Sequence, residues 1–328
     1  MESVNNSNSS IPSFILMGFF GVNVVTDLCF SFPLCLLYLF SFLGNGLILF
    51  IIKSDKRLHT PMFLLISMLA VTDLGESLAT LPTVLGRLWF DFRNINFYIC
   101  LTQLFFVHTF ALTGSTILMA MAFDRYVAIC NPLRYASILH AMLSKIGPVA
   151  LARGVCFTIP FPIFLNRLHY CDNKKLYHAF CFHPDVMKLA CSDPRVTSTY
   201  GVFIVISFFL DLLCILFSYL MILRAVLAIA TREESIKTFS TCVSHICVVL
   251  IFYSPLIGLA GVHRSANDAS PFLPVLMGLA YACIPPGLNP LIYSVKTKQI
   301  WTAIRRHLCL DTRRTSNGIH DDVLERSS

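Results

Sequence analysis

Charged residues are scarce in this chain, which excludes a water-soluble fold of ordinary composition. Asp, Glu, Lys and Arg make up only 13% of the 328 residues, whereas 56% are hydrophobic. Soluble domains carry about 25% charged residues, and a soluble fold of this length could not bury so much apolar surface. The composition therefore indicates a membrane protein in which one bundle of apolar spans with short loops uses the whole chain.

Several functional motifs are absent as well. HExxH, GxSxG and CxxC do not occur and the 13 cysteines are dispersed, so enzymes of these classes, a zinc site and a small disulfide scaffold are not indicated. The net charge of +7 is scattered between apolar runs and forms no basic stripe with interleaved aromatics, which argues against nucleic acid. The basic n-region of a cleavable signal peptide is missing, so the first span is expected to act as an uncleaved insertion signal.

Seven apolar stretches reach the length of about 20 residues that a helix needs to cross a bilayer. Four are expected at residues 28–52, 61–85, 142–165 and 198–223, and three more lie between residues 93 and 124, 237 and 264, and 268 and 296. The predicted fold class is all-α, an integral membrane bundle of seven transmembrane helices. A short amphipathic carboxyl-terminal helix at residues 297–308 is expected on the inner surface, with Trp301, Ile304 and Leu308 toward lipid and Cys309 as a candidate palmitoylation site.

The bias of Lys and Arg sets the expected orientation. The first 52 residues contain neither, and the following loop contains Lys53, Lys56 and Arg57, which predicts an extracellular amino terminus and a cytoplasmic carboxyl terminus. We expect a multi-pass plasma-membrane protein with an extracellular tail (1–27), a seven-helix domain (28–296) and a cytoplasmic helix and tail (297–328). Sequons at Asn5 and Asn8 predict glycosylation of the extracellular tail.

Four sequence strings lie in order along the chain at the expected membrane edges. Residues 58–63 read LHTPMF, residues 121–135 read MAFDRYVAICNPLRY, residues 237–245 read KTFSTCVSH and residues 285–293 read PPGLNPLIY. Together they resemble the olfactory receptor family of rhodopsin-like G-protein-coupled receptors over nearly the whole chain. Residues 185–191, which read DVMKLAC, and the pair His263 and Arg264 resemble the fish-like (class I) branch of that family.

The resemblance implies an odorant receptor, not an enzyme, that binds small volatile ligands and activates the stimulatory G protein of olfactory neurons to raise cyclic AMP. Its partners would be a small-molecule odorant, this heterotrimeric G protein and membrane lipid, with no nucleic acid. A transporter or channel is the alternative class, because Asp73, Glu76 and Asp211 could relay protons within spans. An odd number of spans gives no obvious inverted repeat, however, and no paired catalytic set favours a membrane enzyme.

Polar and aromatic residues near the expected cytoplasmic face are candidates for an activation switch. From the residues alone, Arg125 could snorkel to the interface and Pro290 could cause a static bend in its helix. Tyr219 and Tyr293 could be aromatic side chains that lie at the membrane interface. The resemblance instead implies a switch that rearranges on activation, in which Arg125 contacts the G protein. The residues assigned to the switch and to coupling are Asp124, Arg125, Tyr126, Tyr219, His245, Asn289, Pro290 and Tyr293.

Asp73 and Glu76 place two carboxyl groups on one face of the second span. Carboxylates inside a bilayer are costly and usually face the bundle interior. The resemblance implies a sodium ion at Asp73 with a Glu of the third span as its partner, but Gly114 occupies that position. We hypothesise that Glu76 replaces the missing carboxylate. Alternatively, one carboxyl group is protonated and no ion binds; no cofactor besides this ion, and no other metal, is expected.

Four cysteines lie in or beside the expected long outer loop: Cys100, Cys171, Cys181 and Cys191. They face an oxidising compartment, where disulfide bridges persist. Four cysteines allow three pairings, and the resemblance implies the bridges Cys100–Cys181 and Cys171–Cys191. The first bridge would hold the loop over the mouth of the bundle as a lid.

A ligand site is expected between the outer halves of the helices. The resemblance implies that Arg264, at the outer end of the sixth span, binds a carboxylic acid, and a guanidinium can do so through two parallel hydrogen bonds. His108 and His183 could add donors. Alternatively, Arg264 snorkels to the outer interface and His108 is a satisfied buried polar residue.

The length of the ligand is predicted from two departures from the family pattern. Ala260 stands where relatives that bind short acids can carry Ser, and Pro184 stands where a Gln can occur, so both substitutions remove polar contacts. We therefore predict a ligand with a longer apolar part, such as a medium-chain fatty acid. Four further residues are candidates for the apolar wall of the site: Leu112, Leu259, Phe110 and Ile206.

Overall fold

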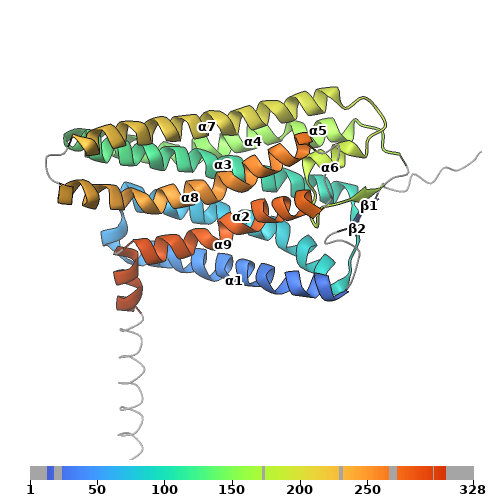
Figure 1. The fold of residues 1–328 in the computed structure, drawn as a ribbon, viewed down its shortest axis with the longest axis horizontal. Helices are drawn as coiled ribbons and strands as arrows, with labels where there is room; N and C mark the ends of the chain where they lie inside the picture. The colour runs from blue at the N-terminus through green and yellow to red at the C-terminus, as the bar shows by residue number, and fades with distance from the viewer. Residues whose placement is uncertain are drawn as a thin grey trace, which may run out of the picture.

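The computed structural model describes residues 13–17, 24–171, 174–228, 232–265, 272–297 and 299–307; side chains 24–30, 136–141, 232–241, 263–265, 272 and 296 lie outside this description. Long helices form a bundle with a small sheet at one end (Figure 1). They are α1 (Val24–Ser54), α2 (Pro61–Phe90), α3 (Phe97–Cys130), α4 (Tyr135–Thr158), α7 (Arg195–Leu227), α8 (Arg232–Ser265) and α9 (Phe272–Lys296). Shorter elements are α5 (Pro160–Asn166), α6 (His183–Lys188), the 3-10 turns η1 (Lys56–Leu58) and η2 (Pro132–Arg134), and strands β1 (Ser13–Leu16), β2 (Asn94–Asn96) and β3 (Lys175–Leu176).

Among the described residues, seven helical segments are long and apolar enough to cross a membrane, which confirms the predicted bundle of seven spans. They are Ser31–Ser54, Pro61–Phe90, Phe97–Cys130, Met142–Asn166, Arg195–Leu227, Cys242–Val262 and Leu273–Val295. The fourth span is divided, since α4 ends at Thr158 and α5 begins at Pro160. Proline lacks an amide hydrogen and is tolerated in the first turn of a helix better than in its interior, which explains why a new segment begins there.

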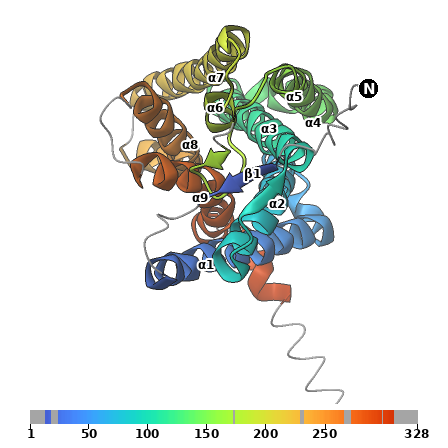
Figure 2. The same cartoon turned by 90° about the vertical axis from the view of Figure 1, so that its right-hand side faces the viewer.

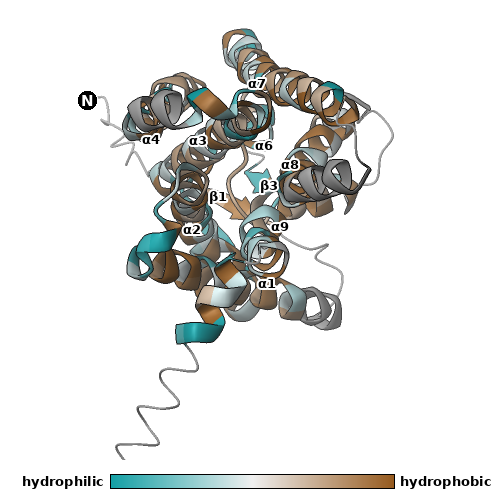
Figure 3. Cartoon of the chain, turned by 90° about the vertical axis from the view of Figure 1, so that its left-hand side faces the viewer, coloured by the Kyte–Doolittle hydropathy of each residue, from teal (hydrophilic) through white to brown (hydrophobic). Residues whose placement is uncertain are grey.

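Large hydrophobic side chains cover the outside of the bundle. Phe50, Leu78 and Phe217, for example, are 58%, 59% and 66% exposed. Figure 3 shows hydrophobic residues predominating on the long helices and hydrophilic ones on the short helix that precedes the grey tail. Water-soluble monomers rarely expose apolar surface on this scale, so these faces are expected to contact the acyl chains of lipid.

The central helix of the bundle is α3, which packs against α2, α4 and α7 and also touches α8. In the most apolar stretch of α3, 72% of the residues are buried inside the protein, which is the largest share among the seven spans. A helix surrounded by protein must satisfy its polar side chains internally. The hydroxyl groups of Thr113 and Thr116 accordingly donate to carbonyl oxygens one turn earlier, at 2.7 and 3.0 Å.

A three-stranded sheet lies across one end of the bundle (Figure 2), with β1 in the centre, antiparallel to β2 and parallel to β3. Phe14 of β1 is buried, and its ring packs edge-on against Phe97 and Tyr170 at centroid distances of 5.7 and 5.4 Å. The Arg87 guanidinium of α2 donates to the Met17 carbonyl oxygen at 2.9 Å. The all-α prediction did not include this sheet, because strands of four, three and two residues are too short to show recognisable alternation.

Residues 299–307 form a short helix that turns away from α9 at the opposite end of the bundle (Figure 1). The carboxyl-terminal helix is therefore present, but the prediction that Ile304 faces lipid is wrong. Ile300 and Ile304 are buried against the rest of the protein, while Trp301 is 43% exposed and carries the Arg305 guanidinium 4.9 Å from its ring centroid. The helix thus rests its aliphatic side chains on the bundle; Leu308 and Cys309 lie outside the described residues.

We expect Phe14→Ala to loosen the sheet, because replacing a buried phenyl ring by a methyl group typically costs about 3–5 kcal/mol. The purified variant should unfold at a lower temperature than the wild type in a thermal denaturation experiment, and fewer copies should reach the cell surface. Ser13→Ala, at an exposed position of the same strand, is the matched control and should change neither quantity. Equal unfolding temperatures for Phe14→Ala and the wild type would show that β1 does not stabilise the protein.

Candidate functional site

Two histidines meet near the sheet end of the bundle. His108 of α3 is buried, and its Nδ1 lies 3.0 Å from the Leu104 carbonyl oxygen one turn earlier. His183, the first residue of α6, is also buried. Both rings pack against Phe161 of α5, with centroid distances of 5.3 Å for His108 and 4.3 Å for His183. The structure thus brings two of the predicted ligand-binding residues together around one aromatic side chain.

The Nε2 atom of His183 is shielded from solvent and has no hydrogen-bond partner among the described residues. Burial, assisted by the nearby His108, lowers the pKa of His183 to about 3, so the ring is neutral at physiological pH. Gly201 of α7 faces its edge, where a Cβ would lie 3.2 Å from the ring. Because a buried polar atom without a partner is costly, this nitrogen is a candidate for contact with a polar group of a ligand.

The predicted apolar wall residues are spread over several places. Leu112 and Leu259 are buried, and Ala260 is half-buried. Phe110 lies against α2, where Gly75 leaves room for its ring because the glycine has no Cβ. Ile206 is 49% exposed and lies off the face of α7 that is buried in the bundle. Leu112 and Leu259 are therefore placed in the protein interior, whereas Ile206 is on the outer side of its helix.

Other predicted contacts depend on side chains that the structure does not describe. Arg264 and His263 belong to α8, but their side chains lie outside the described part of the chain, so the contact of Arg264 with a ligand stays a prediction. Asn5 and Asn8 also lie outside it. Pro184 occupies the first turn of α6, where proline is favoured because the amide hydrogen there has no helical acceptor. This residue therefore has a structural role besides any effect on the ligand.

Two disulfides fix the long loop between α5 and α7. Cys100 is joined to Cys181 and Cys171 to Cys191, with Cα–Cα distances of 5.4 and 5.8 Å. This is the pairing that the sequence resemblance implied. The first bridge ties the loop to the start of α3, directly beneath the sheet.

A buried histidine that sequence reasoning missed ties the same loop to α9. Nδ1 of His178 lies 2.5 Å from Oδ2 of Asp185 in α6, and its Nε2 lies 3.0 Å from the Pro274 carbonyl oxygen in α9. The ring rests on Gly278, where a Cβ would lie only 2.3 Å from it. The loop is thus held on one side by a disulfide to α3 and on the other by His178 on α9. Its Phe182 stacks on the ring of His108 with a centroid distance of 6.0 Å, so the loop covers His108 as a lid.

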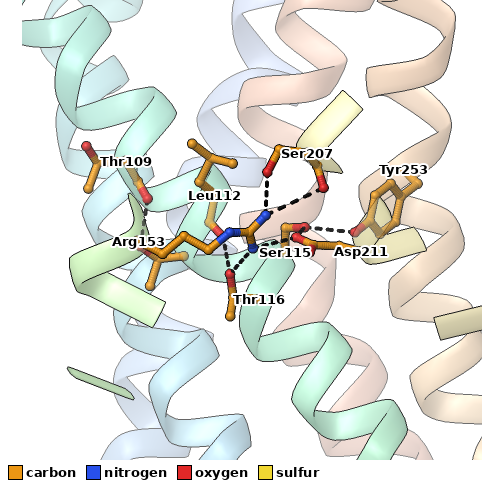
Figure 4. Close-up of polar contacts among 9 residues, drawn as sticks. Thr109, Leu112, Ser115, Thr116, Arg153, Ser207, Asp211 and Tyr253 are labelled. Carbon is orange, nitrogen blue, oxygen red and sulfur yellow. Dashed lines mark hydrogen bonds and ion pairs between the residues drawn. The ribbon is translucent and has the colours of Figure 1, made fainter. Parts of the chain in front are cut away.

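A polar cluster in the interior joins four helices (Figure 4). Arg153 of α4 donates to Oδ2 of Asp211 in α7 at 2.8 Å and to the Thr116 hydroxyl of α3 at 2.5 Å. Ser115 of α3 donates to the same carboxylate at 2.6 Å, and its hydroxyl lies 2.8 Å from that of Tyr253 in α8. Two charges found in separate spans therefore form one ion pair. Sequence reasoning missed the pair because 58 residues separate its members.

Close packing of α4 on α3 makes this cluster possible. A Cβ on Gly154 would lie 2.5 Å from the Thr113 hydroxyl and 2.8 Å from the Thr109 carbonyl oxygen, so only glycine allows the two helices to approach this closely. Hydroxyl groups then surround the ion pair, which offsets the cost of removing its charges from water. Because four helices share these hydrogen bonds, a shift of one helix must change its contacts with the others.

Two carboxyl groups of α2 are buried, and that of Asp73 contacts Asn289 of α9. Asp73 accepts a hydrogen bond from Nδ2 of Asn289 at 3.0 Å. Oε1 of Glu76 and Oδ1 of Asn289 are shielded and have no hydrogen-bond partner among the described residues. A Cβ on Gly114 would make only ordinary contacts, at 3.6 Å or more, and α3 brings no charge here. Carboxylate and amide oxygens are ligands for hard cations, so this group of oxygens could hold a small cation.

The predicted switch residues gather at the end of the bundle opposite the sheet. Arg125 and Asp124 form an ion pair with a distance of 2.6 Å between Nη2 and Oδ2, and the Tyr135 hydroxyl donates to the other oxygen of Asp124 at 3.0 Å. Burial and the charge of Asp124 raise the pKa of Tyr135 to about 12, so this hydroxyl keeps its proton. The Tyr219 hydroxyl of α7 is hydrogen-bonded to Nδ1 of His245 in α8.

Three further residues that were assigned to the switch also lie in packed surroundings between helices. Tyr293 of α9 is buried, and its hydroxyl lies 3.9 Å from the Met121 sulfur of α3. Pro290 packs closely on α1, since a Cβ on Gly44 would lie 2.7 Å from its ring. Tyr126 is half-buried and packs with Tyr219 in a small apolar cluster between α7 and α8. Contacts among α3, α7, α8 and α9 thus meet at this end.

Known proteins resemble this chain over most of its length. The family model described as olfactory receptor matches residues 34–311. Human olfactory receptor 51G2 is 49% identical over 312 residues, which cover 94% of this chain and 99% of that protein, and human olfactory receptor 51L1 is 49% identical over 315 residues, with 95% and 100% covered. Mouse olfactory receptor 51E2 is 45% identical over 303 residues, with 92% and 94% covered.

The bundle also resembles a solved receptor structure. The crystal structure of squid rhodopsin superposes with a TM-score of 0.70 and covers 88% of this chain and 87% of its own, at 18% identity. An identity this low shows a shared fold, while the relatives at 45–49% identity and the family model show common descent over nearly the full chain. The chain belongs to the olfactory receptor family, whose members are multi-pass, G-protein-coupled receptors for small odorant molecules.

Proposed function

We propose that this receptor binds carboxylic acids of medium chain length and activates a stimulatory G protein, which raises cyclic AMP. The observation that carries the proposal is the Nε2 atom of His183, which is buried beside His108 and Phe161 and has no hydrogen-bond partner within the described part of the chain. A neutral imidazole can donate one hydrogen bond to a carboxylate, and the aromatic ring offers apolar surface next to it. Arg264, near the end of α8, would supply the charged contact through a pair of hydrogen bonds.

The proposed chain length follows from the absence of polar side chains at several of the predicted ligand positions. Ala260 and Pro184 have no side-chain donor, and Leu112 and Leu259 present buried hydrocarbon. Each methylene that moves from water into an apolar site contributes about 0.8 kcal/mol. Affinity should therefore rise with chain length until the site is full.

The polar cluster supports a route from the ligand to the G protein. A ligand shifts a receptor to its active state only by binding that state more tightly. We infer that movement of α8 changes the contacts of Tyr253 with Ser115 and thereby with Asp211. The same helix meets Tyr219 of α7 further along the bundle, and rearrangement there would free Arg125 of α3 to contact the G protein.

The positions of disulfides and basic residues support an extracellular amino terminus. Both bridges lie at the end of the bundle that carries β1, and disulfides persist in oxidising compartments. Lys53, in the last turn of α1, lies at the other end together with Lys56 and Arg57, as expected for a cytoplasmic loop.

We further propose that Asp73, Glu76 and Asn289 bind a sodium ion. Two shielded oxygen atoms support this proposal. Oε1 of Glu76 and Oδ1 of Asn289 lack a hydrogen-bond donor among the described residues. A cation would satisfy both and would offset the repulsion between the two carboxylates. The ligands would come from α2 and α9, since Gly114 of α3 offers no oxygen from a side chain.

Arg264→Ala should weaken the response to fatty acids about 10- to 100-fold, because hydrogen bonds to a charged group contribute about 1.5–3 kcal/mol. The measurement is the concentration of each acid that gives half-maximal cyclic AMP, over a series of increasing chain length, with the matching alcohols for comparison. Arg195→Ala is the control, since that side chain is 89% exposed and pairs with Asp193. Normal sensitivity of Arg264→Ala to the acids would rule out the carboxylate contact.

Arg153→Met should remove most receptor from the cell surface, because it leaves Asp211 buried without its partner, at a cost of about 3–5 kcal/mol. The double variant Arg153→Met with Asp211→Leu replaces the pair by apolar side chains and should regain surface expression. It should still fail to raise cyclic AMP, since the link to Ser115 and Tyr253 is gone. Flow cytometry and a cyclic AMP assay measure the two properties, and a normal response of the double variant would contradict the proposed route.

Glu76→Gln should make the receptor insensitive to sodium, because it removes one of the two carboxylates that would hold the ion. Basal and agonist-stimulated cyclic AMP are compared in media that contain sodium or an equal concentration of choline. Asp91→Asn, at the exposed end of α2, is the matched control and should respond to sodium as the wild type does. The same sodium response in Glu76→Gln as in the wild type would exclude this residue as a ligand.

A further inference from the structure

A groove opens on the lipid-facing side of the bundle, between α5 and the first turns of α3. Its volume is about 600 Å³. Among the side chains that line it, Tyr98 and Phe106 of α3 are 57% and 43% exposed, and Ile163 of α5 is 46% exposed. Side chains exposed on the flank of a transmembrane helix face lipid, so the groove is reached from the bilayer and not through the lid.

The groove has a polar end and an apolar end. Tyr98, Asn166 and Arg167 line it where α3 begins and α5 stops, near the sheet. Phe105 and Phe106 line it about 10 Å deeper, since a helix rises 1.5 Å per residue. Tyrosine and arginine are typical of the interface between membrane and water. An occupant that matches the groove therefore has a polar head at the interface and an apolar tail that points into the leaflet.

Arg167 supplies the charge at the polar end. Within the described part of the chain, its guanidinium forms no ion pair or side-chain hydrogen bond. Arg87, Arg93 and Arg195, near the same end of the bundle, are in contrast each paired with an aspartate. A guanidinium is charged at every physiological pH and matches the geometry of a carboxylate, so the groove is complementary to an anion.

We propose that this groove binds a long-chain fatty acid of the bilayer, with its carboxylate on Arg167 and its chain along Phe105, Phe106 and Ile163. One guanidinium and one groove match one carboxylate and one chain. A phospholipid has a second chain for which the groove offers no place, and a sterol has no charge to pair with Arg167. The guanidinium can hold the carboxylate through two parallel hydrogen bonds, with Asn166 as a further donor.

The groove and the two buried histidines lie back to back across α5. Phe161 is 2% exposed and contacts the rings of His108 and His183, whereas the next two residues, Pro162 and Ile163, line the groove. A fatty acid in the groove would therefore press on the outer side of the segment that carries Phe161. This second site does not depend on the proposed odorant site, because none of its lining residues belongs to that site.

Photolabelling of the full-length receptor in phosphatidylcholine nanodiscs tests the proposal. A palmitic acid analogue with a diazirine on its chain should label the peptides that contain Phe105, Phe106 and Ile163. Arg167→Gln should reduce labelling about 3- to 10-fold, since a partly exposed charged contact is worth less than a buried one. Ile163→Trp, at an exposed position that would fill the groove, should abolish labelling, and Arg195→Gln is the matched control that should label as the wild type does.

Competition distinguishes a fatty acid from other lipids. Unlabelled palmitate should prevent labelling, whereas methyl palmitate and cholesterol at the same concentration should not. Equal labelling of Arg167→Gln and the wild type, equal competition by the methyl ester, or labels confined to other helices would each overturn the proposal. Arg264→Ala should keep full labelling, so a failure of the carboxylic-acid odorant model would leave this result unaffected.

Discussion

The ion pair between Arg153 and Asp211 is the contact on which the arrangement of the helices most depends. A guanidinium inside the hydrocarbon region is costly, and α4 can keep one only because α7 brings a carboxylate and α3 brings the Thr116 hydroxyl to it. The pair therefore sets the positions of α4 and α7 along α3. Tyr253 adds α8 to the same network through Ser115, and Gly154 provides the close approach of α4 that the geometry requires.

Helix α3 contributes side chains to polar groups at three levels along the axis of the bundle. His108 lies beneath the lid, Ser115 lies in the polar cluster and Asp124 lies at the switch end. Because α3 is the most buried span, these side chains cannot exchange their protein partners for water. A change in the hydrogen bonds at one level is then relieved by movement of neighbouring helices, which gives an inactive and an active packing a physical basis.

The spans could be predicted from the sequence because an apolar run is a local property, and the family motifs gave the places of Asp124, Tyr219 and the bridged cysteines. Pairings between distant residues could not be predicted in this way. Nothing local indicates that Arg153 meets Asp211, or that His178 of a loop binds a carbonyl of α9. Periodicity likewise showed that Ile304 shares a face with other apolar residues, but not that this face rests on protein.

The central position of β1 has a consequence for how the receptor is made. Its strand leaves the ribosome first, yet its partners β2 and β3 follow α2 and α5 in the chain. At about 5–20 residues per second, the segment must wait on the order of ten seconds or more before the complete sheet can form. Phe14 and Leu16, which are buried in the folded protein, lack these neighbouring strands until then. Transiently exposed apolar side chains and unpaired strand edges favour aggregation, so the interval before the sheet closes is the stage of synthesis at which this end of the receptor is most exposed to misassembly.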